Sequence, residues 1–286
     1  MPQIPQTDAV AERSSVVTVI RPTSGPIPPR LGELWAYREL FSFLILRDLK
    51  VRYAQTTLGT AWMIFQPLAM MAVYTFAFSH LAKVAIPGVP YPVFALSGLV
   101  LWIFISRGVQ IGSESLLTNL PLVTKTACPR ILLTLSAVVA TLADLLIALI
   151  IFLAFSTAYG IYPTWRFALA LPLIAVTFVL VFGLSLLLSA VNVRYRDVSQ
   201  ALPFLLQLWF FLSPVAYLLV TPGRSWQTIV QGVNPAVGLI LAFRWSLLGT
   251  PPPRGLFIAS CATTVLIAVV GLWNFSRAER TIADEI

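Results

Sequence analysis

Six long apolar runs occupy most of this chain, and almost every charge falls between them. Hydrophobic residues make up 58% of the sequence and charged residues only 10%. A soluble protein of 286 residues would need more charged side chains to cover its surface. Because a bilayer core needs about 20 apolar residues per helix, the pattern predicts an all-α membrane protein with six transmembrane helices. The runs are continuous rather than alternating, which argues against a β-barrel.

The predicted spans cover residues 58–81, 93–112, 131–158, 167–191, 201–220 and 256–275. Lys and Arg are enriched in the cytoplasmic loops of membrane proteins. With six spans, fourteen of the nineteen Lys and Arg residues fall on the side of the two termini. We therefore expect a six-span domain at 54–276 with both termini in the cytoplasm. The net charge of +8 is then a topology signal, not a sign of nucleic-acid binding.

Three further segments flank the spans. Residues 1–30 hold six prolines and predict a flexible cytoplasmic tail, and residues 277–286 predict a second one. Residues 31–53 place apolar side chains at helical spacing, which predicts an amphipathic helix along the cytoplasmic interface. A cytoplasmic helix packed on a partner protein is the alternative. The apolar positions of this helix are Leu34, Tyr37, Phe41, Ile45 and Leu49.

Two loops are long enough to carry structure of their own. The cytoplasmic loop 113–130 has an apolar side, and it predicts either a short helix that binds a soluble partner or a simple connector. In the outer loop 221–255, the apolar stretch Pro235–Leu248 is too short to span a bilayer. Asn234 is a suitable helix cap, Pro235 suits the first helical position, and Gly249 ends the stretch. A re-entrant outer hairpin between spans five and six is therefore expected.

Few residues in the spans carry chemistry. Asp144 is the only carboxylate within a span, and it is either a functional acid or a structural partner of Arg107. His80 has no metal-ligating neighbours in the sequence, so no metal site is predicted. Cys128 and Cys261 fall on opposite sides of the membrane, which predicts two free thiols.

The sequence holds no paired carboxylates, no nucleophile turn and no phosphate-binding glycine loop. We therefore expect no catalytic residues and no bound cofactor in this chain. Transport against a gradient would need energy from another polypeptide. Aromatic residues are dense in spans one, two and five, where they either face lipid or line a path for sugars. Four of these aromatic residues are candidates for the path, namely Tyr74, Phe78, Phe210 and Phe211.

Three separated segments resemble one family, the ABC-transporter permeases that export polysaccharides. They are RDLKVRYAQTTLGTAWMIFQPL at 47–68, RYRDVSQALPFLLQLWFFLSPVAY at 194–217 and NPAVGLILAFRWSLLG at 234–249. The resemblance implies export of lipid-linked O-antigen, capsule, teichoic acid or a related glycan across the inner membrane. It also implies a second copy of this chain, two cytoplasmic ATP-binding subunits that hold ATP and Mg, and contact with membrane lipids.

The resemblance implies a role for each of three residue groups. One group in 113–130 would couple the chain to the ATPase, although Cys128 stands where the family usually has an aromatic residue. These coupling residues are Leu116, Leu117, Asn119, Leu122, Lys125, Pro129 and Arg130. A second group would meet the lipid pyrophosphate, or would only anchor the chain at the cytoplasmic face: Arg47, Lys50, Arg52, Arg194 and Arg196. A third group would shape the outer gate: Ser213, Pro214, Asn234 and Pro235.

Three alternatives differ from this prediction. An ABC permease that exports lipids or drugs would share the architecture but have a narrow apolar cavity. A proton-coupled transporter predicts an inverted repeat and paired intramembrane acids, and the sequence shows neither. A membrane glycosyl- or phosphotransferase predicts clustered acidic residues at an interface, which are also absent from the sequence.

Overall fold

The computed structural model describes residues 35, 37–54, 61–81, 86, 88–125, 128–195, 197–218, 231–250 and 254–279. Every regular element within these ranges is a helix, which confirms the all-α prediction. The tail predicted at 1–30 lies outside the described residues, as do residues 280–286 of the tail predicted at 277–286, whose residues 277 and 278 belong to α11. The α-helices are α2 (Arg38–Ala54), α3 (Ala61–Tyr74), α4 (Tyr91–Thr118), α5 (Leu120–Lys125), α6 (Ile131–Ala158), α7 (Ala170–Arg194), α8 (Asp197–Leu212), α10 (Pro235–Leu248) and α11 (Arg254–Ala278). Two short helices of other types are the π-helix η1 (Thr75–Leu81) and the 3₁₀-helix η2 (Trp165–Leu169).

Among the described residues, four helical stretches are long and apolar enough to cross a membrane. They are α4, α6, α11 and the continuous stretch Trp165–Arg194 formed by η2 and α7. These four correspond to predicted spans two, three, four and six. Predicted spans one and five fall on α3 with η1 and on α8, which are apolar but shorter. The chain is therefore a multi-pass membrane protein, and the count of six spans stays a prediction.

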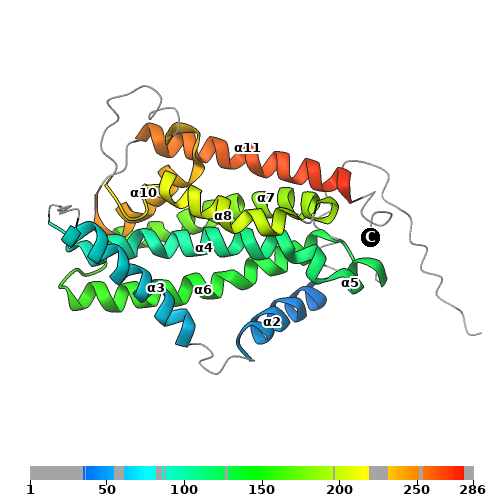
Figure 1. Ribbon diagram of the computed structural model, residues 1–286, viewed down its shortest axis with the longest axis horizontal. Coiled ribbons are helices and arrows are strands. Elements are labelled where there is room, and N and C mark those ends of the chain that lie inside the picture. Colours follow the sequence, from blue (N-terminus) through cyan, green and yellow to red (C-terminus); the bar gives the residue numbers. More distant parts are fainter. Residues whose placement is uncertain are drawn as a thin grey trace, which may run out of the picture.

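Helix α4 forms the centre of the bundle. It lies between α6 on one side and α7 and α8 on the other, and α11 packs outside α7 (Figure 1). Large side chains along its length are fully buried, among them Leu99, Phe104 and Ile105. The neighbouring helices α6, α7 and α8 therefore bury most of α4, which makes it the central helix of the bundle.

The contact between α7 and α11 is a close approach of two backbones. A Cβ atom added to Gly271 of α11 would lie 2.2 Å from the carbonyl oxygen of Gly183 in α7. Only glycine permits this distance. Small residues at helix crossings are the usual means of tight packing between membrane helices, where dispersion replaces the hydrophobic effect.

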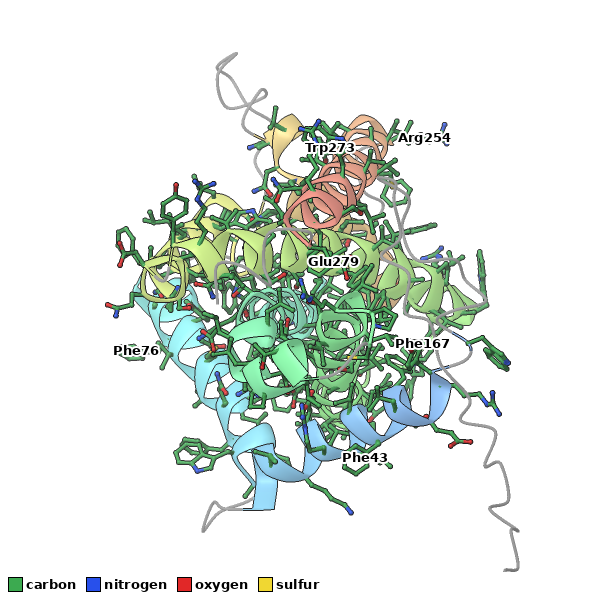
Figure 2. The ribbon with its side chains drawn as sticks, turned by 90° about the vertical axis from the view of Figure 1, so that its right-hand side faces the viewer. Phe43, Phe76, Phe167, Arg254, Trp273 and Glu279 are labelled. Carbon is green, nitrogen blue, oxygen red and sulfur yellow. The ribbon has the colours of Figure 1, made fainter. Side chains whose placement is uncertain are left out.

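The two ends of the bundle hold different structures. Helix α10 and η1 lie at one end, and α2 and α5 lie toward the other (Figure 1). Viewed from that second end, α2 runs across the bundle (Figure 2). Its Leu44 is 1% exposed, while Phe43, labelled in the same view, is 63% exposed. A helix is thus present within predicted 31–53, and its location at a membrane interface stays a prediction.

Candidate functional site

The chain makes a sharp corner where α4 ends and α5 begins. Asn119 occupies this corner: its backbone N–H donates to the carbonyl of Leu116, and its carbonyl accepts from the N–H groups of Leu122 and Val123. Its side-chain amide donates to the carbonyl of Ser115 at 2.8 Å. Asn119 therefore forms hydrogen bonds with backbone N–H and C=O groups at the end of α4 and the start of α5, which the bend would otherwise leave unpaired.

Helix α2 is held against this corner by a hydrogen bond and by apolar packing. The Nη2 group of Arg47 donates to the side-chain oxygen of Asn119 at 2.7 Å and to Asp48 at 2.7 Å. Leu44, one turn earlier, packs into a buried apolar cluster with Leu116 and Val123. A charged hydrogen bond and an apolar contact thus join α2, α4 and α5 at one place.

A second contact joins the start of α6 to the chain that follows α11. The backbone N–H of Arg130 donates to Oε1 of Glu279 at 3.3 Å, and its guanidinium donates to the carbonyl of Glu279 at 2.5 Å. Burial raises the pKa of the Glu279 carboxyl above its usual value, while the Arg130 N–H and charge act in the opposite direction. Glu279 lies near the centre of this end of the bundle (Figure 2).

The structure places the predicted coupling residues on the α4–α5–α6 corner. Leu116 and Asn119 are buried, and Pro129 and Arg130 precede α6 directly. Cys128 is also buried. The side chain of Lys125 lies outside the described residues. No disulfide joins Cys128 to Cys261, as predicted.

A groove of about 640 Å³ opens between α2, α4 and α6. Arg47 lines it near the corner and Arg107 lines it farther along α4. Twelve residues of α4 separate Arg107 from Asn119, which corresponds to about 18 Å along the helix axis. Gln110 and Ser115 supply polar groups, and the remaining lining residues are Asp48, Val51, Ile111, Thr118, Asn119 and Ala137. The groove is therefore amphiphilic, with a cation toward each end.

Beyond the groove, Arg107 contacts two other helices. Its Nη1 lies 3.6 Å from the carboxylate of Asp144 in α6, and its Nη2 donates to the side chain of Gln66 in α3. Of the two alternatives for Asp144, the structure contains the ion pair with Arg107. An adjoining cavity of about 10 Å³ is lined partly by Gln66 and Pro67, and it has room for about one water molecule. Sequence reasoning missed Gln66, whose only signal was a polar residue within an apolar run.

The residues predicted to meet a lipid pyrophosphate are only partly gathered. Arg47 lines the groove, and Lys50 is exposed on the same helix. Arg194 ends α7 with its guanidinium 5.5 Å from the ring centre of Tyr195, and it does not line the groove. Arg196 and the side chain of Arg52 lie outside the described residues. The structure instead adds Arg107 to the groove, which the sequence indicated only as an ion-pair partner.

The four predicted pathway aromatics form one continuous cluster at the other end. Ring centres lie 6.3 Å apart for Tyr74 and Phe78, 5.1 Å for Tyr74 and Phe210, and 5.3 Å for Phe210 and Phe211. Phe210 is buried and also packs edge-to-face on Trp102 of α4. Phe211 is 54% exposed. The cluster therefore links α3, η1 and α8 through tilted, stacked and edge-to-face ring contacts.

The side chain of Asn234 makes four hydrogen bonds, of which one caps α10 and three join it to the end of α8. Its side-chain oxygen accepts from the N–H of Ala236 at 3.0 Å and from the indole N–H of Trp209 at 2.7 Å. Its amide donates to the carbonyl of Leu212 and to the hydroxyl of Ser213. The prediction that Asn234 caps this helix is confirmed. Pro214 and Pro235 are buried beside it, and Gly249, with φ at 85°, ends the helix as expected.

Sequence reasoning missed Arg244, which was counted only as one charge on the outer side. It is 2% exposed, although it belongs to a helix of fourteen residues near the end of the bundle. Its Nη2 donates to the carbonyl of Val215 at 2.7 Å, and its guanidinium carbon lies 3.8 Å from the ring centre of Phe94. A lone arginine in an apolar helix was the only signal in the sequence.

The fold and these contacts define a multi-pass helical membrane protein with one polar corner and one aromatic end. The chain belongs to the ABC-2 type transporter family, whose pattern matches residues 39–248. The matched range contains the corner, the groove, the aromatic cluster and α10. As a member of this family, the chain is a transport protein and not itself an enzyme, and membership implies an ATP-binding partner.

Three relatives have names that describe transport of surface glycans. The chain is 33% identical to the O-antigen export system permease protein RfbA of Myxococcus xanthus, over 74% of this chain and 81% of that protein. It is 28% identical to the protein of the same name from Klebsiella pneumoniae, over 86% and 95% of the two chains. It is 22% identical to the polysialic acid transport protein KpsM of Escherichia coli, over 84% and 93%. The resemblance seen in three sequence segments is confirmed.

Proposed function

We propose that this chain is the membrane-spanning subunit of an ATP-driven exporter of lipid-linked polysaccharide in the inner, cytoplasmic membrane. One observation carries this proposal: relatives named as O-antigen export permeases align with this chain over 81% and 95% of their own length. The relative named for polysialic acid transport supports the same substrate class. The cargo is a cell-surface glycan polymer rather than a drug or a free lipid.

Six spans with both termini in the cytoplasm are part of this proposal. Helix α3 with η1 forms the first span and α8 the fifth, and α10 forms the re-entrant outer segment. The described part of α8 buries one face only, since Phe204 is 65% exposed and Leu208 46% exposed. Helix α3 and η1 likewise expose Phe65 and Phe76, and Phe76 lies at the edge of the bundle (Figure 2). Lipid and a second copy of this chain would cover these apolar faces.

The α4–α5–α6 corner is the proposed contact with the two ATP-binding subunits. The chain itself binds no cofactor in this proposal, because ATP and Mg belong to the partner. Force on α5 would reach α4 through the backbone of Asn119 and would reach α2 through Arg47. Both helices border the groove, so a movement of the corner would change the shape of the groove.

The groove is the proposed place where the lipid-linked substrate first meets the chain. Arginine is suited to phosphate groups, since its guanidinium donates two parallel hydrogen bonds. Arg47 lies at the groove, with Lys50 and Arg52 later on the same helix, and Arg194 and Arg196 would act at the α7–α8 turn. The aromatic cluster of Tyr74, Phe78, Phe210 and Phe211 would then stack on sugar rings near the outer side.

Export by cells that lack the native permease tests this function. The chain and its cognate ATPase are expressed together, and surface glycan is measured with an antibody or lectin. We expect export with the wild-type pair and loss of export, with lipid-linked glycan retained inside the cell, when residues 114–127 are deleted. A catalytically inactive ATPase is the matched control and should give the same retention. If the deletion left assembly and export intact, the coupling role would be wrong; if wild type exported no glycan, the substrate class would be wrong.

A further inference from the structure

The outer end of α8 is held by side chains from two other helices. A helix ends with carbonyl groups that have no partner within the helix, and these groups must be satisfied by something else. The carbonyls of Leu212, Val215 and Ala216 accept hydrogen bonds from Asn234, Arg244 and Tyr91, respectively. Arg244 belongs to α10, Asn234 caps that helix, and Tyr91 belongs to α4. The last residue of α8 and two residues of the turn that follows are therefore held in place by these side chains.

Arg244 differs from the other two donors because it carries a charge. Besides its bond to Val215, its Nε donates to the hydroxyl of Ser97 at 3.2 Å, and its guanidinium covers the face of Phe94. Among the residues that the structure describes, no carboxylate forms an ion pair with Arg244. The carbonyl of Val215 in the turn after α8, the hydroxyl of Ser97 and the ring face of Phe94 therefore stabilise the charge in place of a carboxylate.

The surface of α4 leaves space for this arrangement at Gly98, which has no side chain. A Cβ atom on Gly98 would lie 2.3 Å from the carbonyl oxygen of Val215 and 2.6 Å from Nη2 of Arg244. Any larger residue would therefore push the turn and the guanidinium away from α4. Gly98, the turn at Val215 and Arg244 therefore form one contact among α4, the end of α8 and α10, and we call this contact the joint.

A cation held in this way has two favourable environments. In the joint, every group around Arg244 must be in place, because a buried charge without its partners is strongly unfavourable. If the joint separates, water can replace the carbonyl and the hydroxyl. An intermediate arrangement, with the partners lost and water excluded, is disfavoured. The joint should therefore be either closed or fully open.

We propose that Arg244 is a positioning residue that locks the outer end of α8 in the closed state of the exporter. This inference rests on the proposed function, because α8 carries Phe210 and Phe211 of the proposed sugar path. Closure keeps Phe210 packed against Trp102 of α4 and Tyr74 of α3 between transport cycles. Opening breaks the bond from Arg244 to Val215 and lets the end of α8 move with its aromatic residues.

Leak through the purified complex tests the lock separately from export. The chain and its cognate ATPase are reconstituted in liposomes loaded with a small fluorescent dye, and dye release is followed without ATP. Arg244→Met keeps an unbranched side chain about as long as the stem of arginine but removes the guanidinium group and its charge, and we expect dye release to rise at least five-fold. Arg244→Lys keeps one donor for Val215 and should lie between wild type and Arg244→Met. Arg254→Met, at an exposed position on α11, is the matched control and should resemble wild type.

A cross-linking arm remains informative if Arg244→Met does not assemble. Ser97→Cys and Val215→Cys are combined in a chain whose Cys128 and Cys261 are replaced by serine, and a short thiol cross-linker is added. We expect cross-linking to stop glycan export without causing leak, and a reducing agent that cleaves the linker to restore export. Unchanged export after complete cross-linking would overturn the lock, as would wild-type dye release from an assembled Arg244→Met complex. If the wild-type complex exported no glycan with ATP, the proposed function would be wrong. The dye measurement needs no glycan, so it would still decide the role of Arg244.

Discussion

Arg107 of α4 and Asp144 of α6 form an ion pair, with 3.6 Å between Nη1 and Oδ2. The Asp144 side chain is 3% exposed, while that of Arg107 is 30% exposed because it also lines the groove. The bond from Arg107 to Gln66 extends this pair to α3. One polar contact thus connects three helices inside an apolar bundle, where polar side chains have few other partners.

Removing the acid alone should destabilise the protein more than removing both charges. In Asp144→Asn, Arg107 loses its counter-ion but keeps Gln66 and part of its solvent contact. We expect a loss of about 1–3 kcal/mol in the free energy of unfolding, and a partial recovery in the double variant Arg107→Gln/Asp144→Asn. Thermal unfolding in detergent measures both, with Ser106→Ala on the same helix as control. A double variant less stable than Asp144→Asn would contradict the ion-pair explanation.

Loss of the bond between α2 and the corner should weaken coupling without preventing assembly. Asn119→Ala removes the acceptor for Arg47 and the side-chain bond to Ser115. A hydrogen bond to a charged group contributes about 1.5–3 kcal/mol, so α2 should exchange its amide hydrogens faster. Hydrogen exchange and surface glycan together check this prediction, and export should fall several-fold. Lys50→Ala, at an exposed position on α2, is the control for hydrogen exchange. Equal exchange in α2 of wild type and Asn119→Ala would contradict the proposed connection.

Glu279 should make stability depend on pH. Burial raises the pKa of its carboxyl in the folded state, so folding favours the protonated form. This contribution is complete below the unfolded pKa of about 4.5 and is lost as pH rises through the folded pKa. Glu279→Gln keeps the acceptor for the Arg130 N–H, so it should unfold at a higher temperature than wild type at pH 7. The advantage should shrink toward pH 4.5, which thermal unfolding across this range would show. An advantage that is constant with pH would point to another cause.

The approach of α7 and α11 predicts opposite effects for two glycines of one helix. Gly271→Ala places a methyl group 2.2 Å from the carbonyl oxygen of Gly183, whereas Gly255→Ala meets nothing within 4 Å. Overpacking of this kind costs about 1–3 kcal/mol, while alanine in an open helical position is favoured by about 1 kcal/mol. We therefore expect a lower unfolding temperature for Gly271→Ala and an equal or higher one for Gly255→Ala. Equal destabilisation by both would contradict the packing argument.

Local sequence was sufficient for the features that depend on neighbours along the chain. Helical spans follow from apolar length, and the cap by Asn234 and the stop at Gly249 follow from residue types at helix ends. Predicted span two ended at residue 112, whereas α4 continues to Thr118. The additional turns are helical because Leu116 is buried against other helices, which apolar length alone does not reveal.

The position of the candidate sites was less predictable. The sequence predicted Arg47 to meet a lipid pyrophosphate and Asn119 to couple the chain to the ATPase. In the structure the two side chains are hydrogen-bonded to each other. Gln66 and Arg244 were missed because each was one polar residue in an apolar run. Their roles depend on Arg107 and Val215, which lie on other helices.

Composition and periodicity alone specify a helical membrane protein of this class, because a bilayer requires long apolar segments whose backbones are satisfied internally. Residue types at helix ends also specified the cap at Asn234 and the stop at Gly249, since capping acts over a few residues. The pairing of helices was decided only by the folded chain, where Arg244 meets Ser97 across 147 residues and Arg47 meets Asn119 across 72. Such contacts depend on shape and on the burial of charge among neighbouring helices, and no local pattern encodes either.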